Sequence, residues 1–191
     1  PFCPVFGLCG GCSLQHMSYE SQLRNKTQRV DDCMKRIGGF ENVPVLPCIG
    51  MEDPFDYRNK VQLVVSGSGL GKKRNNRGLS AGFYARRTHQ VVYTERCRIQ
   101  PEIADQIKDT VLLYMKSNNI SVYDETKHKG LVRHIMIRKS VNTDDIMVAI
   151  VATENNRSFM KGLTDILVSN FPDIKTVVLN LNDKVTNVIL G

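Results

Sequence analysis

The chain has 191 residues, of which 41% are hydrophobic and 24% charged, and its formal net charge is +7. This composition is typical of a globular protein and excludes a disordered or fibrous chain. The longest apolar run, 146–152, is too short to cross a bilayer, and the opening PFCPVFG has neither the basic start nor the apolar core of a secretory signal.

Three cysteines crowd the first twelve residues of the chain, namely Cys3, Cys9 and Cys12. Two thiolates two residues apart converge on one metal centre, and Gly10 and Gly11 let the backbone bend around it. A disulfide framework is the competing interpretation, but nothing marks the chain as secreted and a chain of this length can build a core unaided. We therefore expect a metal or cluster site. Because the chain opens without Met, we also expect a fragment or a processed product.

Such a site needs a fourth ligand, and both Cys48 and Cys97 are candidates. Cys48 lies in a loop, and Cys97 lies between a predicted strand and a predicted helix. Cys33 is set aside, since with Val30 and Ile37 it falls on the expected buried stripe of an amphipathic helix. Spacing alone leaves the fourth ligand open. It does not separate zinc from an iron–sulfur cluster either, because both accept four thiolates.

The first part of the chain is predicted to hold two helices and three strands. Ser18 is the expected N-cap of a helix that runs to Ile37 and ends at Gly38-Gly39. Three prolines make residues 40–57 a predicted loop. The elements that follow are a strand at 61–65, a flexible basic loop at 67–78, strands at 81–86 and 90–94, and a helix at 101–115.

A second unit is expected from Lys129 onward. Its predicted elements are a hairpin of strands 131–139 and 146–153, a helix at 158–169, and strands at 174–180 and 184–189. His134, in the first of these strands, faces either the core or a ligand. We therefore predict an α+β protein with mixed or antiparallel sheets, packed helices and an N-terminal cysteine-cluster loop, organised as units 1–128 and 129–191.

Positive charge is concentrated in residues 58–97, which hold nine basic residues and one acid, a net charge of +8. Such a field attracts polyanions and gives salt-dependent binding to phosphates, whereas the plainer interpretation is a solvated basic loop. Interleaved rings favour nucleic acid, because flat rings beside guanidinium groups can stack on unpaired bases. These rings belong to Phe83, Tyr84, His89 and Tyr93.

A series of motifs runs through the chain, beginning with CPVFGLCGGCSLQH at 3–16. The series continues with Tyr19, Gln22, Leu23 and Lys26; Tyr57-Arg58-Asn59-Lys60; Gly82-Phe83-Tyr84 with His89; Cys97; Leu131-Val132-Arg133-His134; and Asn180-Leu181-Asn182 with Thr186-Asn187-Val188-Ile189-Leu190-Gly191. Together these motifs resemble the uracil-C5 RNA methyltransferases, the S-adenosylmethionine-dependent enzymes that make 5-methyluridine in ribosomal or transfer RNA. The resemblance is to the subgroup with a 4Fe–4S cluster and covers essentially the whole chain, although the basic insertion at 71–78 is longer than usual.

The resemblance implies that this chain is the central portion of a longer enzyme. Family members usually have a small β-barrel RNA-binding domain before this region and a Rossmann-like methyltransferase domain after it. The S-adenosylmethionine pocket, the nucleophilic cysteine and the general base are therefore expected outside this chain, which has no catalytic residue of its own. In that family the fourth cluster ligand follows the strand after the Gly-Phe-Tyr element, which implies a 4Fe–4S cluster on Cys3, Cys9, Cys12 and Cys97.

The expected partner is ribosomal or transfer RNA, and the expected protein is cytoplasmic and monomeric. The cluster would pin the N-terminal loop to the sheet, without a redox step. The expected RNA-binding residues are Arg58, Lys60, Arg86 and Arg87, for phosphates, and Phe83 and His89, for stacking on splayed bases. Two other classes remain as alternatives: a ferredoxin-like electron carrier and a zinc-dependent nucleic-acid-binding module without enzymatic activity.

Overall fold

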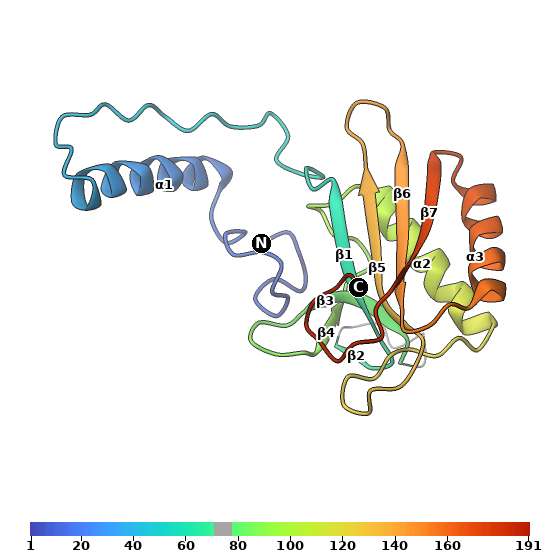
Figure 1. The fold of residues 1–191 in the computed structure, drawn as a ribbon. Coiled ribbons are helices and arrows are strands. Elements are labelled where there is room, and N and C mark those ends of the chain that lie inside the picture. Colours follow the sequence, from blue (N-terminus) through green and yellow to red (C-terminus); the bar gives the residue numbers. More distant parts are fainter. Residues whose placement is uncertain (71–77) are drawn as a thin grey trace.

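The computed structural model describes residues 1–70 and 78–191, in which seven strands form one mixed sheet of order β2-β4-β3-β1-β5-β6-β7 (Figure 1). The strands are β1 (Lys60–Ser66), β2 (Gly69–Leu70), β3 (Ser80–Tyr84), β4 (Val91–Tyr93), β5 (Val132–Lys139), β6 (Ile146–Ala152) and β7 (Ile174–Leu181). The helices are α1 (Tyr19–Asp32), which continues as the π-helical turn η1 (Cys33–Ile37), α2 (Glu102–Ser117) and α3 (Arg157–Asn170). The predicted α+β class is confirmed. Most of the expected basic loop, 71–77, lies outside the described residues.

The strand β1 lies at the centre of this sheet and pairs antiparallel with both β3 and β5. The expected hairpin of β5 and β6 is antiparallel, as is the pair of β3 and β4, whereas β6 with β7 and β2 with β4 are parallel. Parallel neighbours need a crossover, which α3 supplies between β6 and β7. One sheet thus runs through both of the units expected from the sequence.

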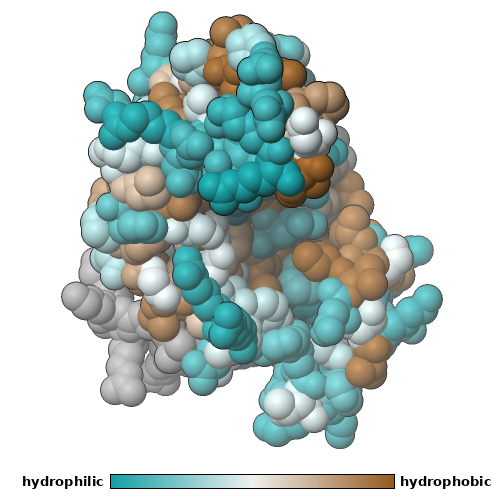
Figure 2. Space-filling view, turned by 90° about the vertical axis from the view of Figure 1, so that its left-hand side faces the viewer, coloured by the Kyte–Doolittle hydropathy of each residue, from teal (hydrophilic) through white to brown (hydrophobic). Residues whose placement is uncertain are grey.

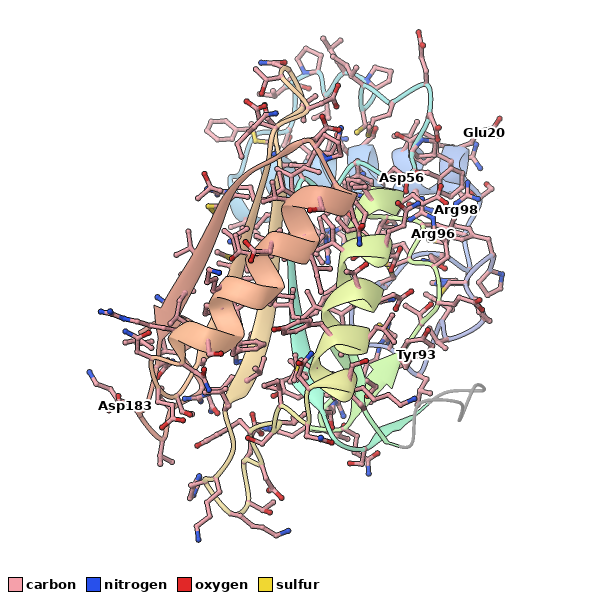
Figure 3. The ribbon with its side chains drawn as sticks, turned by 90° about the vertical axis from the view of Figure 1, so that its right-hand side faces the viewer. Glu20, Asp56, Tyr93, Arg96, Arg98 and Asp183 are labelled. Carbon is pink, nitrogen blue, oxygen red and sulfur yellow. The ribbon has the colours of Figure 1, made fainter. Side chains whose placement is uncertain are left out.

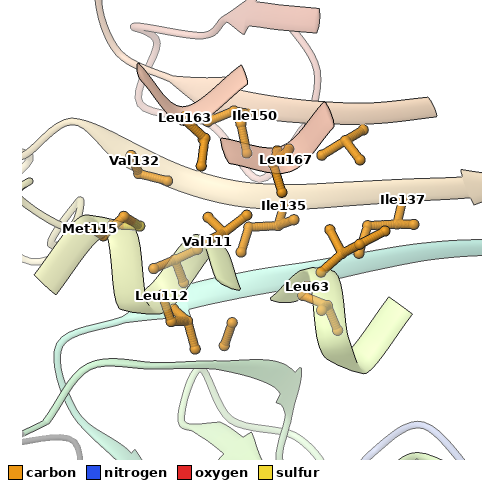
Figure 4. Close-up of a cluster of buried hydrophobic side chains, with 14 of the residues drawn as sticks. Leu63, Val111, Leu112, Met115, Val132, Ile135, Ile137, Ile150, Leu163 and Leu167 are labelled. Carbon is orange, nitrogen blue, oxygen red and sulfur yellow. The ribbon is translucent and has the colours of Figure 1, made fainter. Parts of the chain in front are cut away.

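One face of the sheet carries the hydrophobic core. Along β1, alternate residues point to this face, so Val61, Leu63 and Val65 are buried. The helices α2 and α3 both cover it (Figure 3). Buried aliphatic side chains from β5, β6 and the two helices complete the cluster, including Val111, Leu112, Met115, Ile135, Ile137, Ile150, Leu163 and Leu167 (Figure 4).

The strand β5 contains a β-bulge at Arg133. Val132 pairs with Ala152 and His134 with Val151, so Arg133 is an extra residue in the ladder. Such an insertion shifts the alternation of side chains by one. Val132 therefore belongs to the hydrophobic core, as does Ile135, while the core includes neither Arg133 nor His134.

The C-terminal segment does not form the expected strand at 184–189, a stretch that the structure describes completely. The Arg133 guanidinium donates to three backbone oxygens, those of Asn182, Lys184 and Thr186, at 2.9, 2.7 and 3.0 Å. The Asn182 amide donates to two more, those of Val188 and Ile189, at 2.8 and 3.1 Å. The prediction was wrong because these carbonyls turn toward two side chains instead of a neighbouring strand.

The helix α1 stands apart from the sheet, with the segment 38–57 running back toward β1 (Figure 1). Its expected N-cap is confirmed, since the Ser18 hydroxyl accepts a hydrogen bond from the Ser21 amide at 3.2 Å. None of its residues is buried, and Cys33 in η1 is exposed, so the prediction of a buried stripe around Cys33 was wrong. The space-filling view from this side shows apolar patches among hydrophilic ones at the end of the molecule that α1 and this segment form (Figure 2). No helix among the described residues is both long and apolar enough to cross a membrane.

Candidate nucleic-acid interface and cysteine cluster

The N-terminal cysteine loop is attached to the end of β3. The Gly10 amide donates to the Tyr84 carbonyl at 2.9 Å, and the Arg86 amide donates to the Leu8 carbonyl at 3.3 Å. The Arg86 guanidinium also donates to the Cys12 carbonyl at 2.8 Å. A Cβ at Gly10 would lie 2.8 Å from the Tyr84 oxygen, so only glycine allows this close approach. The loop therefore has a defined position on the turn that joins β3 to β4.

Cys97 is held from the other side, by the start of α2. Its backbone amide donates to the Asp105 carboxylate at 3.1 Å, and the same carboxylate binds Arg96 and Lys108, each at 3.2 Å. Arg96 also pairs with Asp56 at 2.6 Å, and the two lie side by side in Figure 3. This network fixes the backbone around Cys97 and engages the Arg96 guanidinium within the protein.

The four expected ligands influence one another electrostatically. The pKa of Cys9 is raised, by burial first and then by the negative charges of Cys12 and Cys3. The pKa of Cys97 is raised to about 11, again by burial first, with Asp105, Cys12 and Cys3 adding to the increase. The Sγ of Cys9 accepts a hydrogen bond from the Gly11 amide at 3.4 Å, which favours a thiolate there.

The other two cysteines lie elsewhere. Cys48 lies beside α1, where its amide donates to the Thr27 hydroxyl at 2.9 Å, and Cys33 is exposed on η1. All six cysteines are free thiols. Within residues 1–70 and 78–191, no three His, Cys, Asp or Glu side chains are close enough to hold a metal ion. Binding one centre would therefore require the thiols of the N-terminal loop to turn toward Cys97.

Two adjoining hollows open on the sheet face opposite α2 and α3. The first, which we call the β1 hollow, measures about 670 Å³, and Arg58, Lys60, Phe83 and His89 are among the residues that line it. The second, the turn hollow, measures about 720 Å³ over the β3–β4 turn and is lined in part by Phe83, Arg86, Arg87 and His89. All six expected RNA-binding residues thus line one hollow or the other.

Glu125 is a residue of this site that sequence reasoning missed. Its carboxylate lies 2.7 Å from Nδ1 of His89 and accepts a hydrogen bond of 2.8 Å from the Tyr84 hydroxyl. Burial alone would raise the pKa of Glu125, but the hydrogen bonds from His89 and Tyr84 outweigh it and lower the pKa. Burial and then the same carboxylate raise the pKa of Tyr84. The pairing spans 36 positions in the chain, so no local pattern could have revealed it.

Rings and cations also contact one another along the β1 hollow. The Arg58 guanidinium lies 5.6 Å from the centre of the Phe83 ring, within the range of a cation–π contact. The Tyr84 and His89 rings are 5.0 Å apart at a tilt of 34°. Such a mixture of flat rings and cations can bind both the phosphates and the bases of a single strand.

Arg133 and His134 are the second pair that sequence reasoning left undecided or missed. Arg133 is 4% exposed and binds the C-terminal segment, and His134 is 8% exposed and lines the β1 hollow. The pKa of His134 is lowered to about 4, by burial first and then by Arg133. Two consecutive polar residues before the apolar stretch of β5 were the available signal, because they break the alternation of the strand.

No protein-family model matches the chain. An uncharacterized RNA methyltransferase of Bacillus cereus is 40% identical over 189 residues, which are 99% of this chain and 40% of that protein. Another, from Halalkalibacterium halodurans, is 42% identical over 189 residues, with the same two shares. The chain thus spans about two fifths of the length of these curated relatives.

Among solved structures, the chain resembles the crystal structure of Pyrococcus abyssi tRNA (uracil-54, C5)-methyltransferase in complex with S-adenosyl-L-homocysteine. The TM-score is 0.68 at 27% sequence identity, over 96% of this chain and 39% of that one. The predicted resemblance to the RNA methyltransferases is therefore confirmed, while membership of the iron–sulfur subgroup stays a prediction: along its whole length, this chain is a homologue of a segment of the RNA methyltransferases, and it has the fold of the matching part of a tRNA uracil-C5 methyltransferase.

Proposed function

We propose that this chain binds and shapes RNA as the central portion of an S-adenosylmethionine-dependent RNA uracil-C5 methyltransferase that acts on ribosomal or transfer RNA. The observation that carries the proposal is the convergence of six cationic and aromatic residues on two adjoining hollows. A base must leave its stack before an enzyme can modify it, and these contacts would stabilise the opened RNA. The methyl donor and the catalytic residues would belong to the part of the relatives beyond the matched segment.

The proposal includes a 4Fe–4S cluster on Cys3, Cys9, Cys12 and Cys97. The donor chemistry fits, because all four are free thiols whose charges interact, and because the Gly11 amide already donates to one of them. When bound, the cluster would be structural, joining the N-terminal loop to the segment after β4. That crosslink would fix the docking of Gly10 and Arg86 beside the turn hollow.

RNA binding is tested with a labelled single-stranded RNA at several salt concentrations. The double variant Arg58→Ala with Lys60→Ala should bind more weakly, and its salt dependence should flatten by about 0.7 in slope for each phosphate that the variant no longer binds. The matched control is Lys161→Ala with Lys175→Ala, which removes two exposed cations that line neither hollow. Equal losses of affinity in both double variants would mean that only the net charge matters, and would contradict the assignment of Arg58 and Lys60 to the RNA site.

The cysteine assignment is tested by analysis of iron, sulfide and zinc after anaerobic purification. Cys97→Ser should lose iron and the visible absorption of a cluster, whereas Cys48→Ser should keep both. Full iron in the Cys97→Ser protein would show the ligand assignment wrong. Zinc without sulfide in the unaltered protein would favour the zinc-dependent nucleic-acid-binding module instead.

A further inference from the structure

The β1 hollow contains a buried polar group that no described residue satisfies. His134 is 8% exposed, lines the hollow, and has no hydrogen-bond partner for its Nδ1 among residues 1–70 and 78–191. Buried polar atoms in folded proteins nearly always have a partner, so such an atom calls for an explanation. A ligand that enters the hollow would supply the missing hydrogen bond.

The charge of His134 limits what that ligand can be. Burial and the neighbouring Arg133 lower its pKa to about 4, so the ring is neutral near pH 7. A neutral imidazole has one N–H donor and one acceptor nitrogen. It therefore suits the uncharged polar edge of a base better than a phosphate, which prefers a cation.

The cations of the hollow lie at a distance from His134. Lys60, Gln62 and Val64 are alternate residues of β1, so their side chains share the open face of the sheet. Val64 pairs with His134, and Lys60 pairs with Arg138 four residues further along β5, which separates the two ends by about 13 Å. The hollow is thus cationic at one end and neutral and buried at the other.

A negative charge in the lining of the hollow, that of Glu125, disfavours phosphate beside it. The Glu125 carboxylate is hydrogen-bonded to Tyr84 and to His89, and its lowered pKa keeps it negatively charged. A phosphate beside it would be repelled, whereas a base can lie against the rings that it holds. Phosphate and base therefore have separate places along this hollow.

We infer that one unpaired base of the bound RNA enters the β1 hollow, with its polar edge at Nδ1 of His134 and its phosphate near Arg58 and Lys60. This inference rests on the proposed RNA-binding function and goes further, because it assigns recognition of a base to a residue outside the basic segment 58–97. It makes His134 a residue that contacts the base and the cations residues that contact only the backbone.

Binding of two RNA strands to the unaltered protein tests whether a base enters the β1 hollow. The probes are a fluorescein-labelled ten-nucleotide oligouridine and the same strand with every base removed, leaving sugar and phosphate. We expect the strand with bases to bind about 5-fold or more tightly than the abasic one, the effect of stacking even a single base. Equal affinity for the two strands would overturn the inference without any variant.

The variant His134→Phe keeps a flat ring and removes both nitrogens. It should bind the oligouridine about 2- to 10-fold more weakly, the effect of removing one hydrogen bond, with unchanged affinity for the abasic strand and an unchanged salt slope. His16→Phe, at a position outside both hollows, is the matched control and should bind like the unaltered protein. Thermal unfolding of each variant checks that it is folded.

The two proposals fail in different ways. If the unaltered protein binds neither strand, the RNA-binding function fails, and the inference fails with it. If it binds both strands, and Arg58→Ala with Lys60→Ala weakens both, the function stands. An affinity for oligouridine that His134→Phe leaves unchanged would then overturn the inference alone.

Discussion

Two parts of this molecule use the same kind of helix in different ways. The helices α2 and α3 bury apolar residues on the sheet, such as Val111 and Leu163, which are both 0% exposed. In α1 no residue is buried, and at the end of η1 Ile37 is 84% exposed. All three show the periodicity of an amphipathic helix. The difference teaches that such a pattern predicts a helix and its apolar face but does not say what covers that face.

The largest expected contrast is between a buried and an exposed ion pair. Asp105→Ala removes the buried carboxylate that binds Lys108, whose side chain is 2% exposed, and leaves it with the more exposed Asp109 at 3.5 Å as its carboxylate partner, so the free energy of unfolding should fall by about 3–5 kcal/mol. Asp31→Ala removes the partner of the exposed Lys35 next to α1 and should cost about 0.5 kcal/mol or less. Urea unfolding of both variants measures the contrast. Similar losses of stability would mean that α1 is as integral to the fold as α2.

A second contrast compares apolar side chains in the two regions. Leu163→Ala should lower the free energy of unfolding by about 2–5 kcal/mol, because it opens a cavity in the core. Ile37→Ala, at a position that is 84% exposed, should change it by about 0.5 kcal/mol or less. The same urea experiment applies, and a large effect at Ile37 would contradict the description of α1 as lying apart from the core.

The smallest contrast compares two N-caps. The Asn156 side chain accepts a hydrogen bond from the Phe159 amide at 3.0 Å, as the Ser18 hydroxyl does from Ser21. Asn156→Ala should lower the global free energy of unfolding by about 1 kcal/mol. Ser18→Ala should instead increase amide hydrogen exchange in α1 and leave the global transition in place. A matching loss of global stability in Ser18→Ala would join the two regions into one cooperative unit.

Local patterns in the sequence predicted most of the fold. Alternating residues marked β1 and β5, the continuous apolar run 146–152 marked β6, and cap residues such as Ser18 marked where a helix begins, because these signals act over a few neighbouring positions. The strand expected at 184–189 was wrong because its carbonyls bind Arg133, about fifty residues earlier in the chain. Contacts between distant segments decide such cases, and local patterns do not encode them.

In the candidate site, too, local patterns predicted some residues and long-range contacts brought in others. The charged and aromatic residues of the two hollows were predictable, since they crowd one stretch of the chain. Glu125 was not, because it reaches His89 only after the chain returns from α2. The helix expected around Cys33 is present, but the expected burial of Cys33 is not, because α1 does not pack on the sheet.

The extra residue in β5 decides which side chains of the strand face the helices. Upstream of it, Val132 faces the helices, and downstream Ile135 does so again, although an uninterrupted strand would send these two to opposite sides. Removing one residue between them would return the strand to strict alternation with both aliphatic side chains still facing the helices, but it would leave one polar residue on the open face instead of two. Because β5 has one extra residue here, it carries two neighbouring polar side chains with different roles. Arg133 binds the last ten residues of the chain, and His134 forms the neutral end of the β1 hollow.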